Sequence, residues 1–179
     1  HPDREVRLIT LVRDPVSRAV SNLFENPNLL PEETDLRELP VEEVVALAAS
    51  LVESSDTYTE DWFDTELSGV LGFDVFEEPF DKADGFVIVR KGRFSLLMGK
   101  LELLANNGGR YLGEVLNLES DLEIPRRRSR SATDEASLYN QVRESLRLPS
   151  ELLDQVYSSR VCQYFYTPEE IAGFRANWE

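Results

Sequence analysis

The sequence has few of the residues that form disulfides, metal sites and catalytic imidazoles. Its 179 residues include one cysteine, Cys162, and one histidine, His1. A single cysteine cannot form an internal disulfide, which suits a reducing compartment, and one Cys with one His gives no cluster of soft metal ligands. A serine–histidine–acid triad would have to use His1, at a terminus where chains often fray. The composition therefore argues against a disulfide scaffold, a zinc site and that class of hydrolase.

Positive charge is also scarce. Lys and Arg total 19 against 34 Asp and Glu, so the net charge is −15, which disfavours binding to DNA or to an anionic membrane surface. No apolar run approaches the roughly 20 residues of a membrane span, and the first residues lack the layout of a signal peptide. We therefore expect a cytoplasmic protein whose residues 1–179 form a single domain, with no nucleic-acid partner and no membrane span.

Two apolar, β-branched runs predict buried strands at 6–12 and 85–90. A helical apolar pattern follows each strand. Asp14 and Pro15 suit the N-cap and the first residue of a helix after the first strand, and a second helix is predicted over 93–105. Further apolar stripes predict helices at 41–51, 61–71, 134–146, 150–160 and 168–178. This order indicates an α/β fold with a helix-rich C-terminal part.

The segment Leu8–Ser21 carries the strongest chemical signal. A helix N-terminus attracts anions, and Arg13, at the end of the preceding strand, has a guanidinium that can fork onto a phosphate. Ser17 and Ser21 are four residues apart and lie on one side of the helix. The pattern favours a phosphate site made by Arg13, Ser21 and Ser17. The alternative is an ordinary helix start, with a surface Arg–Asp pair and serine hydroxyls that bond back to the helix.

This segment resembles the 3′-phosphate-binding motif of sulfotransferases that use PAPS (3′-phosphoadenosine 5′-phosphosulfate). In that superfamily a strand ends in Arg, then Asp or Asn, then Pro, and a Ser follows eight residues after the Arg. The resemblance implies that Arg13 and Ser21 hold the 3′-phosphate of the co-substrate PAPS or of its product PAP (3′-phosphoadenosine 5′-phosphate), without a metal.

Further landmarks look like a bacterial sulfotransferase-like family described as putative capsular polysaccharide synthesis proteins. They lie at Trp62–Leu67, Gly72–Phe80, Leu148-Pro149 and Tyr164–Ile171, through Phe174 and Trp178. Tyr139 is the retained residue of an element that precedes the Leu-Pro helix in that family. The resemblance implies a P-loop-like sulfotransferase fold and sulfuryl transfer to a hydroxyl or amine, with a surface glycan as acceptor partner.

One part of the superfamily pattern is not found in the sequence. No Gly/Ser/Thr-rich loop for the 5′-phosphosulfate follows an apolar strand. We therefore expect the N-terminal strand–loop–helix to lie outside this chain and the chain alone to be inactive, with its catalytic base unassigned. A second interpretation is a non-catalytic nucleotide-binding or interaction module derived from the same fold. A third is an acidic helical partner protein without a ligand.

A basic cluster stands out in this acidic chain. Arg126, Arg127, Arg128 and Arg130 lie close together among serines. Such a segment is either a solvated loop or a contact for a phosphate or an anionic sugar. Arg126, Arg127 and Arg128 are therefore added to the candidate nucleotide-binding residues.

Overall fold

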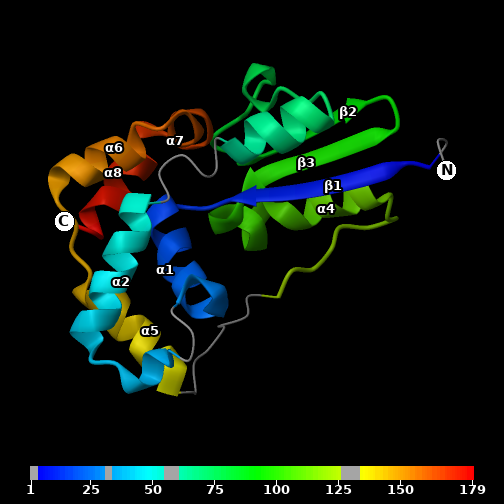
Figure 1. Ribbon diagram of the computed structural model, residues 1–179. Helices are drawn as coiled ribbons and strands as arrows, with labels where there is room; N and C mark the ends of the chain where they lie inside the picture. Colours follow the sequence, from blue (N-terminus) through cyan, green and yellow to red (C-terminus); the bar gives the residue numbers. More distant parts are fainter. Residues whose placement is uncertain (1–3, 31–33, 55–60, 126–133) are drawn as a thin grey trace. The chain divides into compact units, whose positions relative to one another are not determined.

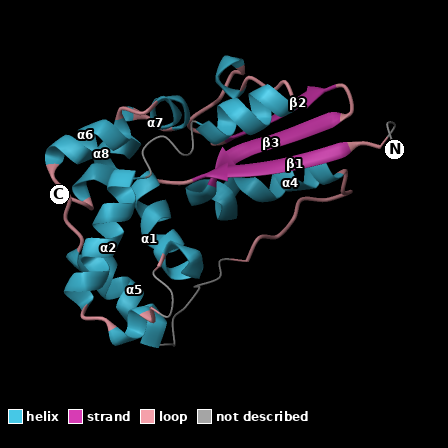
Figure 2. Cartoon of the chain, in the orientation of Figure 1, coloured by secondary structure: helices cyan, strands magenta, loops and turns pink. Residues whose placement is uncertain are grey.

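The computed structural model describes residues 4–30, 34–54, 61–125 and 134–179. It is a mixed α/β structure with one three-stranded sheet and many helices (Figures 1 and 2). The chain divides into two compact units. The first takes its described residues from His1–Arg13, Thr59–Arg126 and Gln163–Thr167, and the second from Asp14–Tyr58, Arg127–Cys162 and Pro168–Glu179. The division separates Arg13 from Asp14, so the first strand and the helix after it belong to different units.

The first unit contains the sheet, which has the order β1-β3-β2. Its strands are β1 (Val6–Val12), β2 (Phe86–Lys91) and β3 (Phe94–Lys100). β1 runs parallel to the central strand β3, with Val6 opposite Phe94 and Val12 opposite Lys100. β2 runs antiparallel to β3, and Figure 2 shows the three strands as neighbours. The strands predicted at 6–12 and 85–90 are confirmed as β1 and β2.

The helix predicted over 93–105 is wrong, because this segment forms β3 and two short irregular helices after it. Those helices are η5 (Leu101–Leu103) and the π-helix η6 (Leu104–Gly108). Gly92 has φ 57° at the first central position of the two-residue hairpin turn between β2 and β3, where glycine suits a II′ turn. Residues 95–100 are all buried, and a strand buried on both faces shows a continuous apolar run that periodicity cannot distinguish from a helix.

The rest of the first unit packs around the sheet and an aromatic cluster. The helix expected near 61–71 is present, mainly as the π-helix η3 (Phe63–Val70), and η4 (Val75–Glu77) and α4 (Gly109–Leu116) follow. Phe63 stacks on Phe165 at 5.9 Å between ring centroids, and Phe80 meets Phe165 edge-on at 4.8 Å. Phe63 and Phe73 belong to the buried core, whereas Trp62 and Phe76 are half-buried.

The second unit is helical. Its helices include α1 (Pro15–Glu25), α2 (Val41–Ser54), α5 (Asp134–Ser145), α6 (Ser150–Tyr157) and α8 (Pro168–Ala176), with η1 (Pro27–Leu29) and η2 (Leu36–Glu38) between α1 and α2. The predicted helices after Pro15 and at 41–51, 134–146 and 168–178 are confirmed. The helix predicted over 150–160 is present as α6 but ends at Tyr157. After a short turn, α7 (Arg160–Phe165) begins.

The core of this second unit is apolar and nearly closed to solvent. It contains Val16, Val20, Leu23, Val44, Ala48, Val142, Leu146, Leu153, Cys162 and Trp178. Cys162 is fully buried, as expected of a small hydrophobic residue. Over the described ranges, no helix has the length and apolar character required to cross a membrane.

Candidate functional site

A buried carboxylate holds the start of α1. Asp14 is the N-cap, and its Oδ2 accepts hydrogen bonds from the Ser17 backbone N at 3.1 Å and the Ser17 Oγ at 2.6 Å. Tyr157 donates its hydroxyl to Oδ1 at 2.6 Å, and the Trp178 Nε1 donates to Oδ2 at 3.3 Å. Asp14 is only 3% exposed, and four donors compensate its lost hydration. The predicted N-cap is confirmed, and Asp14 also ties α6 and the residue Trp178 to α1.

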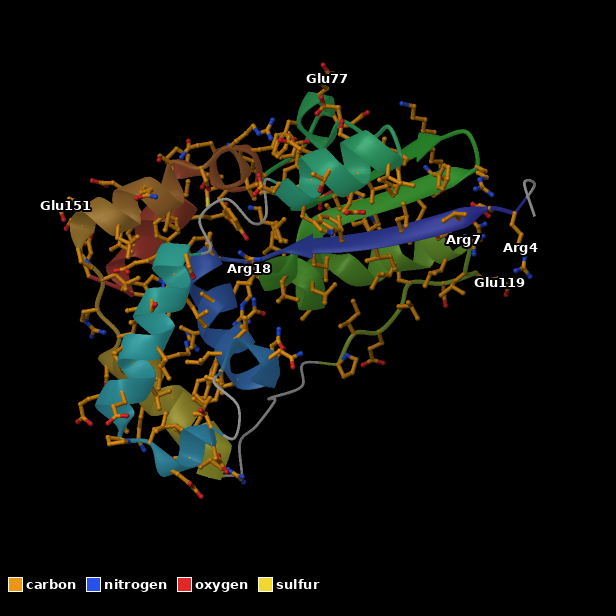
Figure 3. All side chains as sticks on the ribbon, in the orientation of Figure 1. Arg4, Arg7, Arg18, Glu77, Glu119 and Glu151 are labelled. Atoms are coloured by element: carbon orange, nitrogen blue, oxygen red, sulfur yellow. The ribbon has the colours of Figure 1, made fainter. Side chains whose placement is uncertain are left out.

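The tyrosine beside Asp14 keeps its proton. Burial raises the pKa of Tyr157 far above its ordinary value, and the negative charge of Asp14 and their hydrogen bond raise it further. The phenol therefore remains a hydrogen-bond donor across the physiological range. This pair positions the first turn of α1 rather than exchanging protons. Figure 3 labels Arg18 on this turn, and its backbone N donates to the Asp14 carbonyl at 2.8 Å.

The two serines of the predicted phosphate site both lie on α1, in different surroundings. Ser17 is half-buried, and its hydroxyl donates to Asp14. Ser21 is 8% exposed, and its Oγ lies 3.2 Å from the Tyr139 Oη, so one hydroxyl donates to the other. The Tyr139 ring meets Phe24 edge-on at 5.3 Å. The structure thus joins the serine of the Arg-Asp-Pro motif to the tyrosine shared with the family element.

Arg13 directly follows β1 in the first unit and is half-buried. β1 and β3 are parallel and end together, since Val12 pairs with Lys100. Arg13 therefore lies at the carboxyl edge of a parallel strand pair, the edge where open α/β sheets bind ligands. Arg126, Arg127 and Arg128 lie outside the described residues. The phosphate-binding roles of Arg13, Ser17 and Ser21 remain predictions.

A buried lysine at this edge was missed by the sequence reasoning. Lys100 is 0% exposed, its Nζ donates to the Lys82 carbonyl at 2.6 Å, and it lies 5.2 Å from the ring centroid of Tyr166. Tyr166 in turn donates its hydroxyl to Glu102 Oε2 at 3.3 Å. A carbonyl and an aromatic face are among the partners that make a buried cation tolerable. The sequence does contain a signal for this position. Lys100 stands at the end of a mainly apolar run that follows the glycine turn at Gly92, and a polar residue at that place indicates the end of a strand.

A second feature of the first unit is a polar pocket of about 510 Å³ beside η6 and α4. Asp84 accepts hydrogen bonds there from the Tyr111 hydroxyl and the Asn107 Nδ2, and it pairs with Arg110 at 3.5 Å. Burial raises the pKa of Tyr111, and Asp84 adds to the effect. Among the described residues, no three His, Cys, Asp or Glu side chains are grouped to hold a metal ion. The contacts of Asp84 are therefore local hydrogen bonds and an ion pair. The pocket also lies beside the π-helix η6, and π-helical segments often occur at functional sites.

Comparison with known proteins identifies a family. The model of the family described as "Putative capsular polysaccharide synthesis protein" matches residues 42–167, well over half of the chain. No curated protein and no solved structure matches the chain. The match includes Lys100 and Tyr139 and begins after Ser21, so the Arg-Asp-Pro motif lies outside it. The chain belongs to the family of putative capsular polysaccharide synthesis proteins.

Proposed function

We propose that this chain binds the 3′-phosphorylated nucleotide PAPS or PAP and serves sulfuryl transfer to a hydroxyl or amine of a surface polysaccharide. The family description supports a role in polysaccharide synthesis. One observation supports the nucleotide: the Arg-Asp-Pro sequence stands where a strand ends and a capped helix begins. β1 ends at Val12, and α1 begins at Pro15 behind its N-cap Asp14.

Each residue of the motif has a chemical role in this proposal. Arg13 donates paired N–H groups to the 3′-phosphate, and charge-assisted hydrogen bonds of this kind are the strong ones. Ser21 offers a hydroxyl whose orientation depends on Tyr139. Asp14 keeps the first turn of α1 in place. Ser17 and the Arg126–Arg128 segment are further candidate contacts, and a P-loop-like sulfotransferase fold is part of the same proposal.

The transfer itself requires little covalent chemistry from the protein. An acceptor oxygen or nitrogen forms a bond to the sulfur of PAPS, and the bond from sulfur to the bridging phosphate oxygen breaks. The nucleotide leaves as PAP, and the acceptor proton passes to a base. Fixed donors that stabilise the charge on the leaving phosphate supply much of such a rate enhancement.

A second candidate is a non-catalytic nucleotide-binding module. It is favoured by the engagement of Asp14, whose carboxylate already accepts four hydrogen bonds. The carboxylate of the motif, Asp14, and the phenol of Tyr157 beside it thus serve structure rather than proton transfer. Release of PAP from PAPS that depends on an added glycan acceptor would identify the enzyme. In a protein that also carries the 5′-phosphosulfate loop, nucleotide binding without such release would identify the module.

Calorimetry with PAP and with adenosine 5′-phosphate, which lacks the 3′-phosphate, tests the nucleotide site. We expect PAP to bind at least about tenfold more tightly. A hydrogen bond to a charged group contributes about 1.5–3 kcal/mol, so Arg13→Ala should weaken PAP binding about tenfold to a hundredfold. Arg37→Ala is the matched control, because Arg37 is exposed and pairs with Asp35 on η2. Equal affinities for the two nucleotides, or a PAP affinity that Arg13→Ala leaves unchanged, would contradict the proposal.

A further inference from the structure

A polar pocket of about 350 Å³ lies in the second unit between α5 and the last residues of the chain. Its lining consists of Asn140, Arg143, Glu144, Arg147, Asn177 and Trp178. The first four are spaced i, i+3, i+4 and i+7, so they share one face of α5 and its end. The Leu148 N donates to the Trp178 carbonyl at 2.8 Å, which ties the two walls together. The volume lies within the usual range for small ligands.

Arg143 in this pocket contacts aromatic rings rather than a carboxylate, although the chain is strongly acidic. Its guanidinium lies 5.9 Å from the Tyr139 ring centroid and 6.0 Å from that of Trp178. Within the part of the chain that the structure describes, Arg143 makes neither a hydrogen bond nor an ion pair. By contrast Arg7, Arg37, Arg90, Arg110 and Arg175 each pair with a carboxylate. Arg143 is exposed. Its two ring contacts, near the outer limit of a cation–π interaction, orient the guanidinium and leave its N–H groups available to a ligand.

The two rings that hold Arg143 are themselves fixed at their polar ends. The Tyr139 hydroxyl bonds to Ser21, and the Trp178 indole N–H bonds to Asp14. Arg147 is fixed by its Nη1, which donates to the carbonyls of Glu144 at 3.0 Å and Leu146 at 2.7 Å. Its other guanidinium N–H groups have no acceptor among the described residues. The guanidinium groups of Arg143 and Arg147 are thus partly oriented by protein contacts in the absence of a ligand, which reduces the entropic cost of binding.

We propose that this pocket binds one anionic sugar unit through a singly charged oxyanion, a carboxylate or a sulfate ester. Arg143 and Arg147 with Glu144 give the charged lining a net charge of one positive unit, which suits a monoanion better than a phosphate dianion. The amides of Asn140 and Asn177 both donate and accept, as sugar hydroxyls require. The sugar part of this inference rests on the proposed function, whereas the oxyanion part rests on the pocket alone.

The indole N–H signal of Trp178 in an amide-correlation NMR spectrum reports directly on this pocket. The chain has two tryptophans, and Trp62, in the first unit, is the internal control. We titrate glucuronate, glucose 6-sulfate, glucose and acetate separately. The expected result is a saturating shift of the Trp178 signal with both anionic sugars, a weak or absent one with glucose and acetate, and a constant Trp62 signal. Response to one anionic sugar alone identifies which oxyanion the pocket takes.

Variants separate the two halves of the inference. Arg143→Met retains the length of the side chain and removes its charge, so affinity for the anionic sugars should fall at least tenfold. Arg37→Met is the charge-matched control within the same unit and should bind as the unchanged chain does. Asn177→Ala should lower the affinity for the two anionic sugars and leave the response of the Trp178 signal to acetate unchanged. Equal thermal midpoints show that each variant is folded.

Three outcomes would overturn the inference. They are the absence of a saturating Trp178 shift with either anionic sugar, an affinity for acetate equal to that for glucuronate, and an Arg143→Met variant that binds like the control. PAP calorimetry on the same samples keeps the proposals apart. PAP binding without sugar binding overturns only the sugar pocket, and sugar binding without PAP binding overturns only the nucleotide site.

Discussion

Among the described residues, each of the two units buries one charged side chain, and the contacts around the two charges differ. In the helical unit, Asp14 is 3% exposed and accepts four hydrogen bonds from Ser17, Tyr157 and Trp178. In the sheet-containing unit, Lys100 is 0% exposed, donates to the Lys82 carbonyl and lies against the ring of Tyr166. The contacts described for the anion are hydrogen bonds, whereas those described for the cation include the face of an aromatic ring.

This difference indicates how much of the surrounding structure depends on each charge. Without the Asp14 carboxylate, several buried donors on separate elements would lose their acceptor, and each such loss is expensive. Without the Lys100 ammonium, the carbonyl of Lys82 would lose one donor, and a carbonyl tolerates this better than an N–H does. The helical unit should therefore be more sensitive to a change at its buried charge.

The largest expected effect comes from Asp14→Ala. Removing one partner of a buried charged network typically costs about 3–5 kcal/mol, and loss of the N-cap is part of that cost. Urea denaturation followed by circular dichroism measures the free energy of unfolding. Asp14→Asn retains one acceptor oxygen and should lose markedly less. A loss below about 1 kcal/mol in the alanine variant would show that the network is not what holds α1 in place.

A smaller effect is expected at Lys100, and its size should depend on the replacement. Lys100→Met fills nearly the same volume without the charge, and such replacements of buried ions change stability by about 1 kcal/mol or even increase it. Lys100→Ala removes the side-chain stem as well and should cost about 2–4 kcal/mol through the cavity. The same denaturation experiment compares the two. If methionine proved as destabilising as alanine, the charge itself would be essential, and Lys100 would resemble Asp14.

The smallest effect is a pH dependence from Tyr164 in the sheet-containing unit. Burial, followed by the nearby charges of Glu78 and Asp74, raises the pKa of Tyr164 to about 12 from 10.0. The folded state retains a proton that the unfolded chain releases near its ordinary pKa. The resulting stabilisation is complete below that value and is lost as pH rises towards the folded pKa. Tyr164→Phe should therefore flatten the decline in stability between about pH 10 and about pH 12.

Urea midpoints at several alkaline pH values measure this slope in the unchanged and Tyr164→Phe chains. The Tyr164 hydroxyl donates to the Glu78 carbonyl at 2.5 Å, so the phenylalanine variant should also lose a little stability at neutral pH. Identical slopes in the two chains would show that the alkaline decline comes from other groups.

Local chemistry predicted the start of α1 well. Asp14 followed by Pro15 predicts an N-cap and first helical residue, and both are present because that pairing satisfies backbone groups within one turn. β1 was also predictable, since its β-branched run precedes an evident break. Such features depend on residues that are neighbours in the chain.

The features that depend on distant residues were missed. β3 was read as a helix because a fully buried strand has no alternation. α4 was not predicted, and two glycines, Gly109 and Gly113, lie within it. Those glycines permit close approach of residues 120–122, since a Cβ at Gly109 would lie 2.1 Å from the Leu122 carbonyl oxygen. The pocket proposed to bind a sugar likewise needs Trp178 beside α5, which no local pattern indicates.

The mixed pairing of the sheet has a consequence for how this protein folds. β2 and β3 are joined by a two-residue turn, so they are close in the sequence and can pair rapidly as a hairpin. β1 instead pairs with a strand far along the chain, since Val6 lies opposite Phe94. The entropy of closing this long loop must be lost before the pairing of β1 with β3 can stabilise the sheet. The hairpin should therefore form early and β1 should join late. Until β1 joins, one edge of β3 lacks its partner strand, and unpaired strand edges favour aggregation.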